Sequence, residues 1–255
     1  MYWCGQAANL SHGDDQDMYR WAESMIRARQ YHRAAHLLKE ANLESKSWQG
    51  CFLASNACYL AGNIEDACKL LEANEELIEK KHSDDALKED QSKKVWLVAL
   101  LVLKGKILEA MDNRTQASEI FREALKLDPY CQEALSYLTK HQMLSADKEQ
   151  ALLESIPFED NEEKELIYFL YSIGLKKYDK PQDLKIPKGL ENDLSDNLAV
   201  QVAIAERHFY NCDYPASHRL SSVVMKKDPF HEICLPIHVS CLVELRKPNG
   251  KLVCH

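Results

Sequence analysis

The chain has 255 residues, of which 45% are hydrophobic and 28% are charged, which is ordinary for a folded protein. Its formal net charge of −8 argues against nucleic acid as a partner, because the phosphate backbone would be repelled on average. The longest apolar run, 95–103, has nine residues and is too short to cross a bilayer, so no membrane association is expected. The sequence starts without the basic and apolar segments of a signal peptide, and its nine cysteines then predict a reducing, intracellular compartment.

Two helical hairpins are predicted in the first quarter of the chain. The first covers 18–46, with Ala22 and Ala34 as the small residues that face each other and a turn at 30–32. The second covers 48–74, with Ala67 at the small position of its second helix and a turn at Gly62-Asn63. A charged stretch near 75–94 follows, which we interpret as an insert between repeats.

The clearest hairpin spans 101–129. Gly105 and Ala117 are small enough to let its two helices approach closely, and Phe121 would fill the gap between this pair and its neighbour. Ala124 continues the same helical face. Pro129 would end the second helix, because proline disfavours a helical residue before it.

A fourth hairpin is predicted at 132–158, with Ala151 at the small position and a turn near 146–147. The second-helix alanines then lie at positions 34, 67, 117 and 151, at intervals of 33, 50 and 34. Two of these intervals match the tetratricopeptide period of about 34 residues, and the third requires the insert.

The pattern loosens after residue 158. We expect a helix at 162–178, an extended linker near 180–189, a hairpin at 197–227 with Ala205 and Ser217 at its small positions, and a last helix at 231–245. Pro229 would stop the second helix of that hairpin. The sequence therefore predicts an all-α solenoid of antiparallel tetratricopeptide helix pairs, wound as a right-handed superhelix. Its parts would be 1–158 and 159–255.

No catalytic motif, cofactor motif or metal motif is found in the sequence. The best metal candidates, His231, Cys234, His238 and Cys241, would lie on one helix with an axial span of about 15 Å, too long for one ion to contact all four. We interpret them as a packed helix face, and the pair His32 and His36 as packing and surface. We therefore expect no catalytic residue, no cofactor and no metal.

Several stretches go beyond the generic repeat. They are similar to subunit six of the anaphase-promoting complex (cyclosome), the cell-division-cycle-sixteen family, at 30–36, 103–107, 112–115, 123–128, 141–144, 152–155, 205–213 and 222–231. The resemblance implies a non-catalytic scaffold subunit of a ubiquitin ligase that controls mitotic progression. It also implies other subunits of that complex as partners, and the nucleus and cytoplasm as its location.

The resemblance further implies a homodimer through the N-terminal repeats and a C-terminal groove that holds a small subunit. Segment 2–11 resembles the second helix of the family's first repeat, and the helix before it is missing from the sequence. The pattern also stops after 245. We therefore expect a solenoid truncated at both ends, without the small-subunit groove and with a weakened dimer. The alternative is a generic tetratricopeptide adaptor that binds a peptide or a chaperone terminus.

Overall fold

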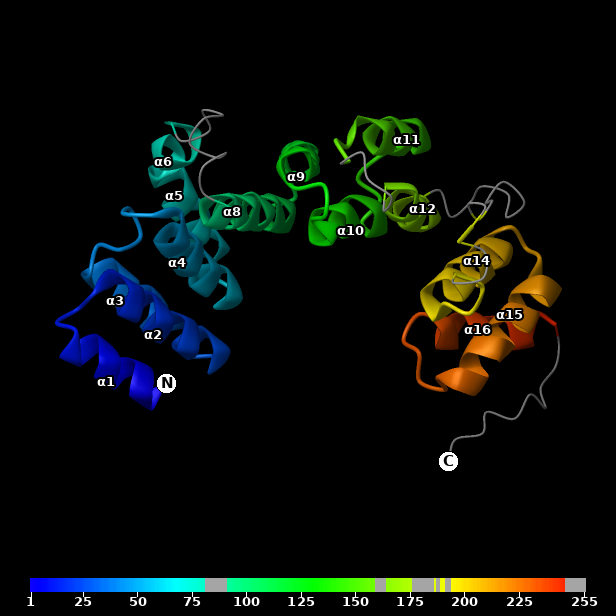
Figure 1. The fold of residues 1–255 in the computed structure, drawn as a ribbon, viewed down its shortest axis with the longest axis horizontal. Helices are drawn as coiled ribbons and strands as arrows, with labels where there is room; N and C mark the ends of the chain where they lie inside the picture. Colours follow the sequence, from blue (N-terminus) through cyan, green and yellow to red (C-terminus); the bar gives the residue numbers. More distant parts are fainter. Residues whose placement is uncertain (81–90, 159–163, 176–185, 187–188, 191–193, 246–255) are drawn as a thin grey trace. The chain divides into compact units, whose positions relative to one another are not determined.

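Every regular element in the described part of the chain is an α-helix (Figure 1). This computed structural model describes residues 1–80, 91–158, 164–175, 186, 189–190 and 194–245. It divides into two compact units, Met1–Leu144 and Ser145–His255. The predicted all-α architecture is confirmed. Residues 81–90 of the expected insert and most of the expected linker at 180–189 lie outside the described residues, and the predicted repeat boundary at 158 stays a prediction.

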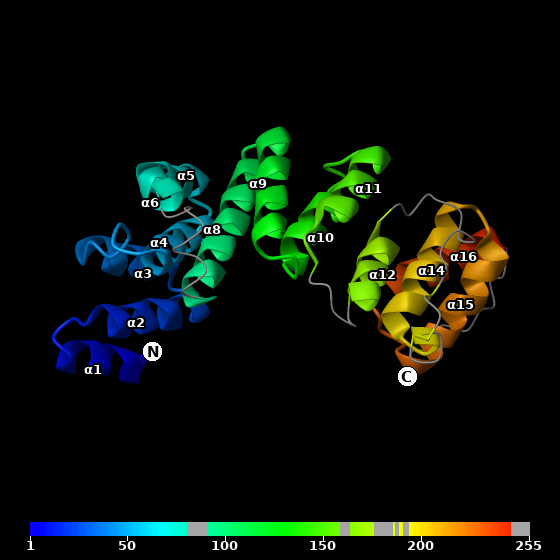
Figure 2. The ribbon, with the colours of Figure 1, turned by 45° about the horizontal axis from the view of Figure 1, so that its top comes forward.

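The first unit is a row of helices in which each of the first five packs against the next, and α9 packs against both α8 and α10. Two further contacts give the row its solenoid character, because α2 packs on α4 and α4 packs on α8, so first helices of successive pairs touch. The pairs are α2 with α3, α4 with α5, and α8 with α9 (Figures 1 and 2). The helices of this unit are α1 (Tyr2–Leu10), α2 (Asp15–Arg27), α3 (Tyr31–Glu40), α4 (Trp48–Leu60), α5 (Ile64–Ala73), α6 (Glu75–Lys80), α8 (Gln91–Ala110), α9 (Arg114–Leu127) and α10 (Gln132–Lys140).

In the second unit α15 packs against both α14 and α16, and α12 packs against α14. Its helices are α11 (Ala146–Ser155), α12 (Lys164–Gly174), α14 (Leu198–Tyr210), α15 (Tyr214–Lys227) and α16 (Cys234–Glu244). The hairpin predicted at 197–227 is therefore confirmed as α14 and α15. Both α9 and α15 stop before an Asp-Pro pair, because Asp128 and Asp228 take extended conformations with ψ of 99° and 92°.

One turn geometry recurs inside the hairpins. The residue after the helix cap has a positive φ at Arg29 (58°), Gly62 (83°), Asp112 (63°) and Cys212 (60°). The next amide donates to a carbonyl five residues back, as from Asn113 to Leu108 at 2.8 Å. This is the Schellman arrangement that closes a helix C-terminus. The predicted turn at Gly62-Asn63 is confirmed.

Two predicted turns are displaced. The turn expected at 30–32 lies at 28–30, since α3 already begins at Tyr31. The turn expected near 146–147 lies at 141–145, since α11 begins at Ala146. In both places the polar residues that suggested a turn belong to the first turn of the following helix.

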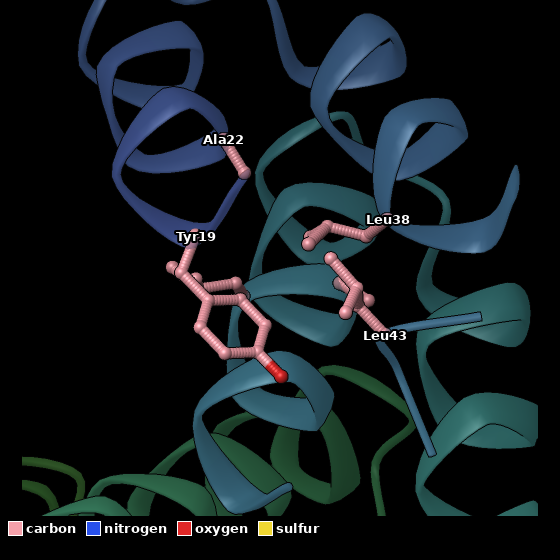
Figure 3. Close-up of a cluster of buried hydrophobic side chains, with 6 residues drawn as sticks. Tyr19, Ala22, Leu38 and Leu43 are labelled. Carbon is pink, nitrogen blue, oxygen red and sulfur yellow. The ribbon is translucent and has the colours of Figure 1, made fainter. Parts of the chain in front are cut away.

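One hydrophobic cluster of the first unit lies between α2, α3 and α4. Tyr19, Ala22, Leu38 and Leu43 point toward one another in this cluster (Figure 3), which Leu53 and Ala54 complete. The tyrosine hydroxyl also reaches out of the cluster to Ser47 Oγ at 2.8 Å. The loop after α3 therefore folds back over the core instead of leaving it.

Gly50 fixes how closely that loop approaches α4. A Cβ atom at this position would lie 2.0 Å from the backbone oxygen of Leu43. A backbone oxygen cannot swing aside as a side chain can, so only glycine fits here.

Candidate partner-binding surface

Most residues predicted at the small and aromatic repeat positions are buried between the helices, and the outer faces of these helices form the surface. Seven of them are fully buried at 0% exposure: Ala22, Ala34, Ala67, Ala117, Phe121, Ala124 and Ala205. Gly105 is buried as well. Pro129 is partly buried and Pro229 is exposed, as suits residues that end helices instead of filling a core.

The contact between Gly105 and Phe121 shows why a glycine stands in α8. A Cβ atom on Gly105 would lie 2.6 Å from the nearest ring carbon of Phe121. The other side of the interface is closed by Tyr137 of α10, whose ring stacks on Phe121 at 5.1 Å between centroids. Phe121 thus contacts α8 and α10 from its place on α9.

Ala151 departs from the prediction. It is exposed, while its neighbours Leu152 and Leu153 are buried at 5% and 2%. Because α11 begins at the residue where a turn was expected, the buried face of this helix is made by the two leucines instead.

Charged side chains cover the outside of the α8–α10 contact. Lys106 Nζ lies 2.5 Å from Glu133 Oε1 and 5.5 Å from the centre of the Tyr137 ring, so one cation serves an ion pair and a cation–π contact. His141 Nδ1 contacts Glu109 Oε1, and Arg114 donates to the backbone oxygen of His141. These contacts brace the joints between consecutive helices.

Four cysteine thiols are held in their protonated form by burial. Burial raises the pKa of Cys51 and of Cys234 to about 11, and burial also raises the pKa of Cys58 and Cys131. Each of these thiols therefore stays protonated near neutral pH, and a protonated thiol is a poor nucleophile and a poor metal ligand.

Each of the four metal candidates in the region of the last helix has a hydrogen-bond partner in the protein, and for Cys234 this is the backbone oxygen of Ser221. His231 Nδ1 accepts from the amide of Cys234, His238 Nδ1 is 2.9 Å from Ser221 Oγ, and the Cys241 thiol donates to Ser217 Oγ. In the part of the chain that the structure describes, no three His, Cys, Asp or Glu side chains are placed to share a metal ion. The arrangement agrees with a packed helix face.

A groove opens where α5 and α9 both pack on α8. Its volume is about 470 Å³, and its walls come from all three helices and the start of α6. The floor is aliphatic and the rim carries carboxylates. Sequence reasoning missed this groove, because the groove depends on how α5 and α9, which lie on either side of the insert, both pack on α8.

No helix in the described ranges is both long enough and apolar enough to span a membrane.

Comparison with known proteins agrees with this architecture. A profile of the family described as "Anaphase-promoting complex, cyclosome, subunit 3" matches residues 1–74. The human cell division cycle protein 16 homolog is 43% identical, over 98% of this chain and 42% of that protein. Anaphase-promoting complex subunit 6 of Arabidopsis thaliana is 29% identical, over 92% of this chain and 47% of its own length.

A solved structure, the hetero-tetramer of Cut9 and Hcn1 from the anaphase-promoting complex, matches with a TM-score of 0.78 and 21% identity. The match covers 96% of this chain and 46% of the other chain. At this level of identity the likeness concerns the fold.

The repeated hairpins, their buried small residues and their shared turn define a helical-repeat protein of the tetratricopeptide type. Within that class, the chain is homologous to the cell division cycle 16 proteins, also named subunit 6 of the anaphase-promoting complex. It spans less than half of the length of these relatives.

Proposed function

We propose that this chain is a non-catalytic scaffold subunit of the anaphase-promoting complex, the ubiquitin ligase that controls mitotic progression. The observation that carries the proposal is the 43% identity to the human cell division cycle protein 16 homolog over 98% of this chain. An identity spread over nearly the whole chain, inserts and loops included, exceeds what a shared repeat pattern alone produces.

The structure supports the scaffold role through what its side chains do. The thiols with raised pKa are protonated, and the histidine and cysteine face of α16 is engaged in packing. What the fold presents to solvent is a series of rigid helical surfaces, which is how repeat proteins bind other proteins. The partners under this proposal are other subunits of the complex, and the location is the nucleus and cytoplasm.

The proposal is tested by affinity purification of the tagged chain from dividing cells, followed by mass spectrometry. We expect several subunits of the complex to be recovered with the chain. A matched Gly50→Leu variant, which cannot place its side chain against Leu43, should recover far fewer because it disrupts the core of the first unit. A chain shown to be folded by circular dichroism that recovers no subunit would rule the proposal out.

The resemblance also suggests a homodimer through the N-terminal repeats, and this is a separate measurement. Light scattering on the purified chain distinguishes monomer from dimer. The generic adaptor that binds a peptide or chaperone terminus is not favoured, because the homology extends over nearly all of this chain to named subunits of one complex.

A further inference from the structure

The groove over α8 has an aliphatic floor made by three helices. Leu71 comes from α5, Ile107 and Leu108 from α8, and Ile120 from α9. Leu71 and Ile107 are buried, whereas Leu108 and Ile120 are half-buried and so remain accessible from outside. The volume of about 470 Å³ lies in the range of pockets that hold a ligand of a few residues.

The rim of the groove is acidic. Glu72, Glu75 and Glu119 line it against a single cation, Lys104. Lys104 Nζ is already paired with Glu75 Oε1 at 3.1 Å. Glu72 accepts a hydrogen bond from the Cys68 thiol at 3.3 Å, and within the described ranges neither Glu72 nor Glu119 has a basic partner. Two carboxylates are therefore left to attract a cation beside an aliphatic surface.

We propose that this groove docks a short basic segment of a partner protein, in which one or two aliphatic side chains are flanked by lysine or arginine. The aliphatic side chains would cover Leu108 and Ile120, and the flanking cations would meet Glu72 and Glu119. An acidic segment is disfavoured because the only lysine of the groove is neutralised by Glu75. This inference deepens the proposed scaffold function. It depends on that function only in assuming that the molecule bound in the groove is a protein.

The test measures binding of a fluorescein-labelled probe peptide to the purified full chain by fluorescence anisotropy. The probe is a capped hexapeptide of alternating lysine and leucine, and its counterpart has glutamate in place of lysine. We expect the lysine probe to bind and to weaken as salt is raised, because exposed charges are screened over about 8 Å at physiological ionic strength. We expect the glutamate probe not to bind.

Charge variants locate the binding. Glu72→Lys with Glu119→Lys should weaken the lysine probe by about tenfold or more, whereas Lys104→Ala should strengthen it by about twofold. Glu232→Lys with Glu244→Lys is the matched control, since it makes the same two charge reversals at exposed residues of the other unit. It should leave the affinity unchanged. If the double reversal unfolds the chain, Glu72→Gln with Glu119→Gln replaces it, with an expected loss of about threefold.

Three results would overturn the inference: no binding of the lysine probe, equal binding of both probes, or equal losses in the groove variants and in the control variant at Glu232 and Glu244. Failure here is distinguishable from failure of the proposed function. A chain that recovers subunits of the complex but ignores the probe loses the groove inference alone. A chain that binds the probe at this groove but recovers no subunit loses the scaffold role alone.

Discussion

Two hairpins in different units, α8–α9 and α14–α15, are built on the same frame at positions 100 residues apart. In both, the chain turns at a residue with φ near 60° and the second helix ends before Asp-Pro. The corresponding residues are Gly105 and Ala205, Asp112 and Cys212, Ala117 and Ser217, Phe121 and Ser221, and Pro129 and Pro229. The frame is shared, so the differences show what each position can tolerate.

The space beside the second helix is filled in two ways. In α8–α9 it holds the ring of Phe121, pressed on Gly105 and stacked on Tyr137. In α14–α15 the equivalent residue is Ser221, and His238 from α16 supplies the ring and lies 2.9 Å from Ser221 Oγ. Ser217 Oγ also donates to the backbone oxygen of Ala205 at 2.8 Å. The same hairpin backbone can therefore form either an apolar or a polar contact between its second helix and the helix that follows. We call this contact the joint of the hairpin.

The largest expected effect is a difference in the free energy of unfolding between variants of the Phe121 joint and of the Ser221 joint. Phe121→Ala should lower the free energy of unfolding of the first unit by about 3–5 kcal/mol, because it empties a fully buried aromatic site. The equivalent Ser221→Ala should cost only about 1–2 kcal/mol, because it removes two hydrogen bonds of modest net value, to the backbone oxygen of His218 and to His238 Nδ1. Urea denaturation of both variants measures the difference. Equal losses would mean that Ser221 is as important to its joint as the ring is.

The second prediction concerns the first-helix position. Gly105→Ala should destabilise by about 1–3 kcal/mol, because its Cβ would lie 2.6 Å from the ring of Phe121 and would force the joint open. Ala205→Gly, the reverse change in the other hairpin, should cost about 0.5–1 kcal/mol through backbone entropy. The double variant Gly105→Ala with Phe121→Ala checks the cause by urea denaturation. Its loss should fall short of the sum of the single losses, and additivity would contradict the clash.

The third prediction concerns the turn residues with positive φ, and the same change in stability is expected in both hairpins. Asp112 and Cys212 hold positive φ without being glycine, so Asp112→Gly and Cys212→Gly should each stabilise by about 0.5–1 kcal/mol. Gly62→Ala, at the same turn position, should destabilise by a similar amount. Thermal unfolding followed by circular dichroism gives all three. A loss of stability in Asp112→Gly would show that its side chain stabilises the turn more than its backbone strains it.

The comparison also shows what the sequence could and could not reveal. The close approach of α8 and α9 at Gly105 and the Asp-Pro stops were predictable, because each depends on residue size or proline chemistry at short spacing, whereas the contact of Gly105 with the Phe121 ring was not predicted. Gly50 was not predictable, since its neighbour is a backbone oxygen of a loop that carries no periodic signal. Ala151 was wrongly predicted to be buried. Counting by the repeat period places a residue on the wrong face of its helix when the preceding turn lies at other residues than expected. The groove over α8 joins residues from both sides of the insert, and no pattern within one repeat reports it.

The smallest expected effect lies in the polar joint and depends on pH. Burial lowers the pKa of His238 below its ordinary 6.5, and the charge of neighbouring His218 lowers it further. The folded chain therefore favours the neutral ring, and below pH 6.5 the unfolded chain binds more protons at this site. The stability that the neutral ring contributes is complete above that pH and is lost as the pH falls. In the other hairpin the buried ring is Phe121, which does not titrate, and His141 packs on Tyr137 instead of taking the place of that ring.

Urea midpoints measured between pH 8 and pH 5.5 test this for the wild type and for His238→Gln. The wild-type midpoint should fall more steeply on acidification than that of the variant, because other titrating groups are common to both and cancel in the difference. Phe121→Leu is the matched control in the other joint, and its pH slope should equal that of the wild type. Parallel slopes for the wild type and His238→Gln would mean that the charged ring is accommodated as well as the neutral one. The two hairpins would then differ in packing volume only, and not in their response to protons.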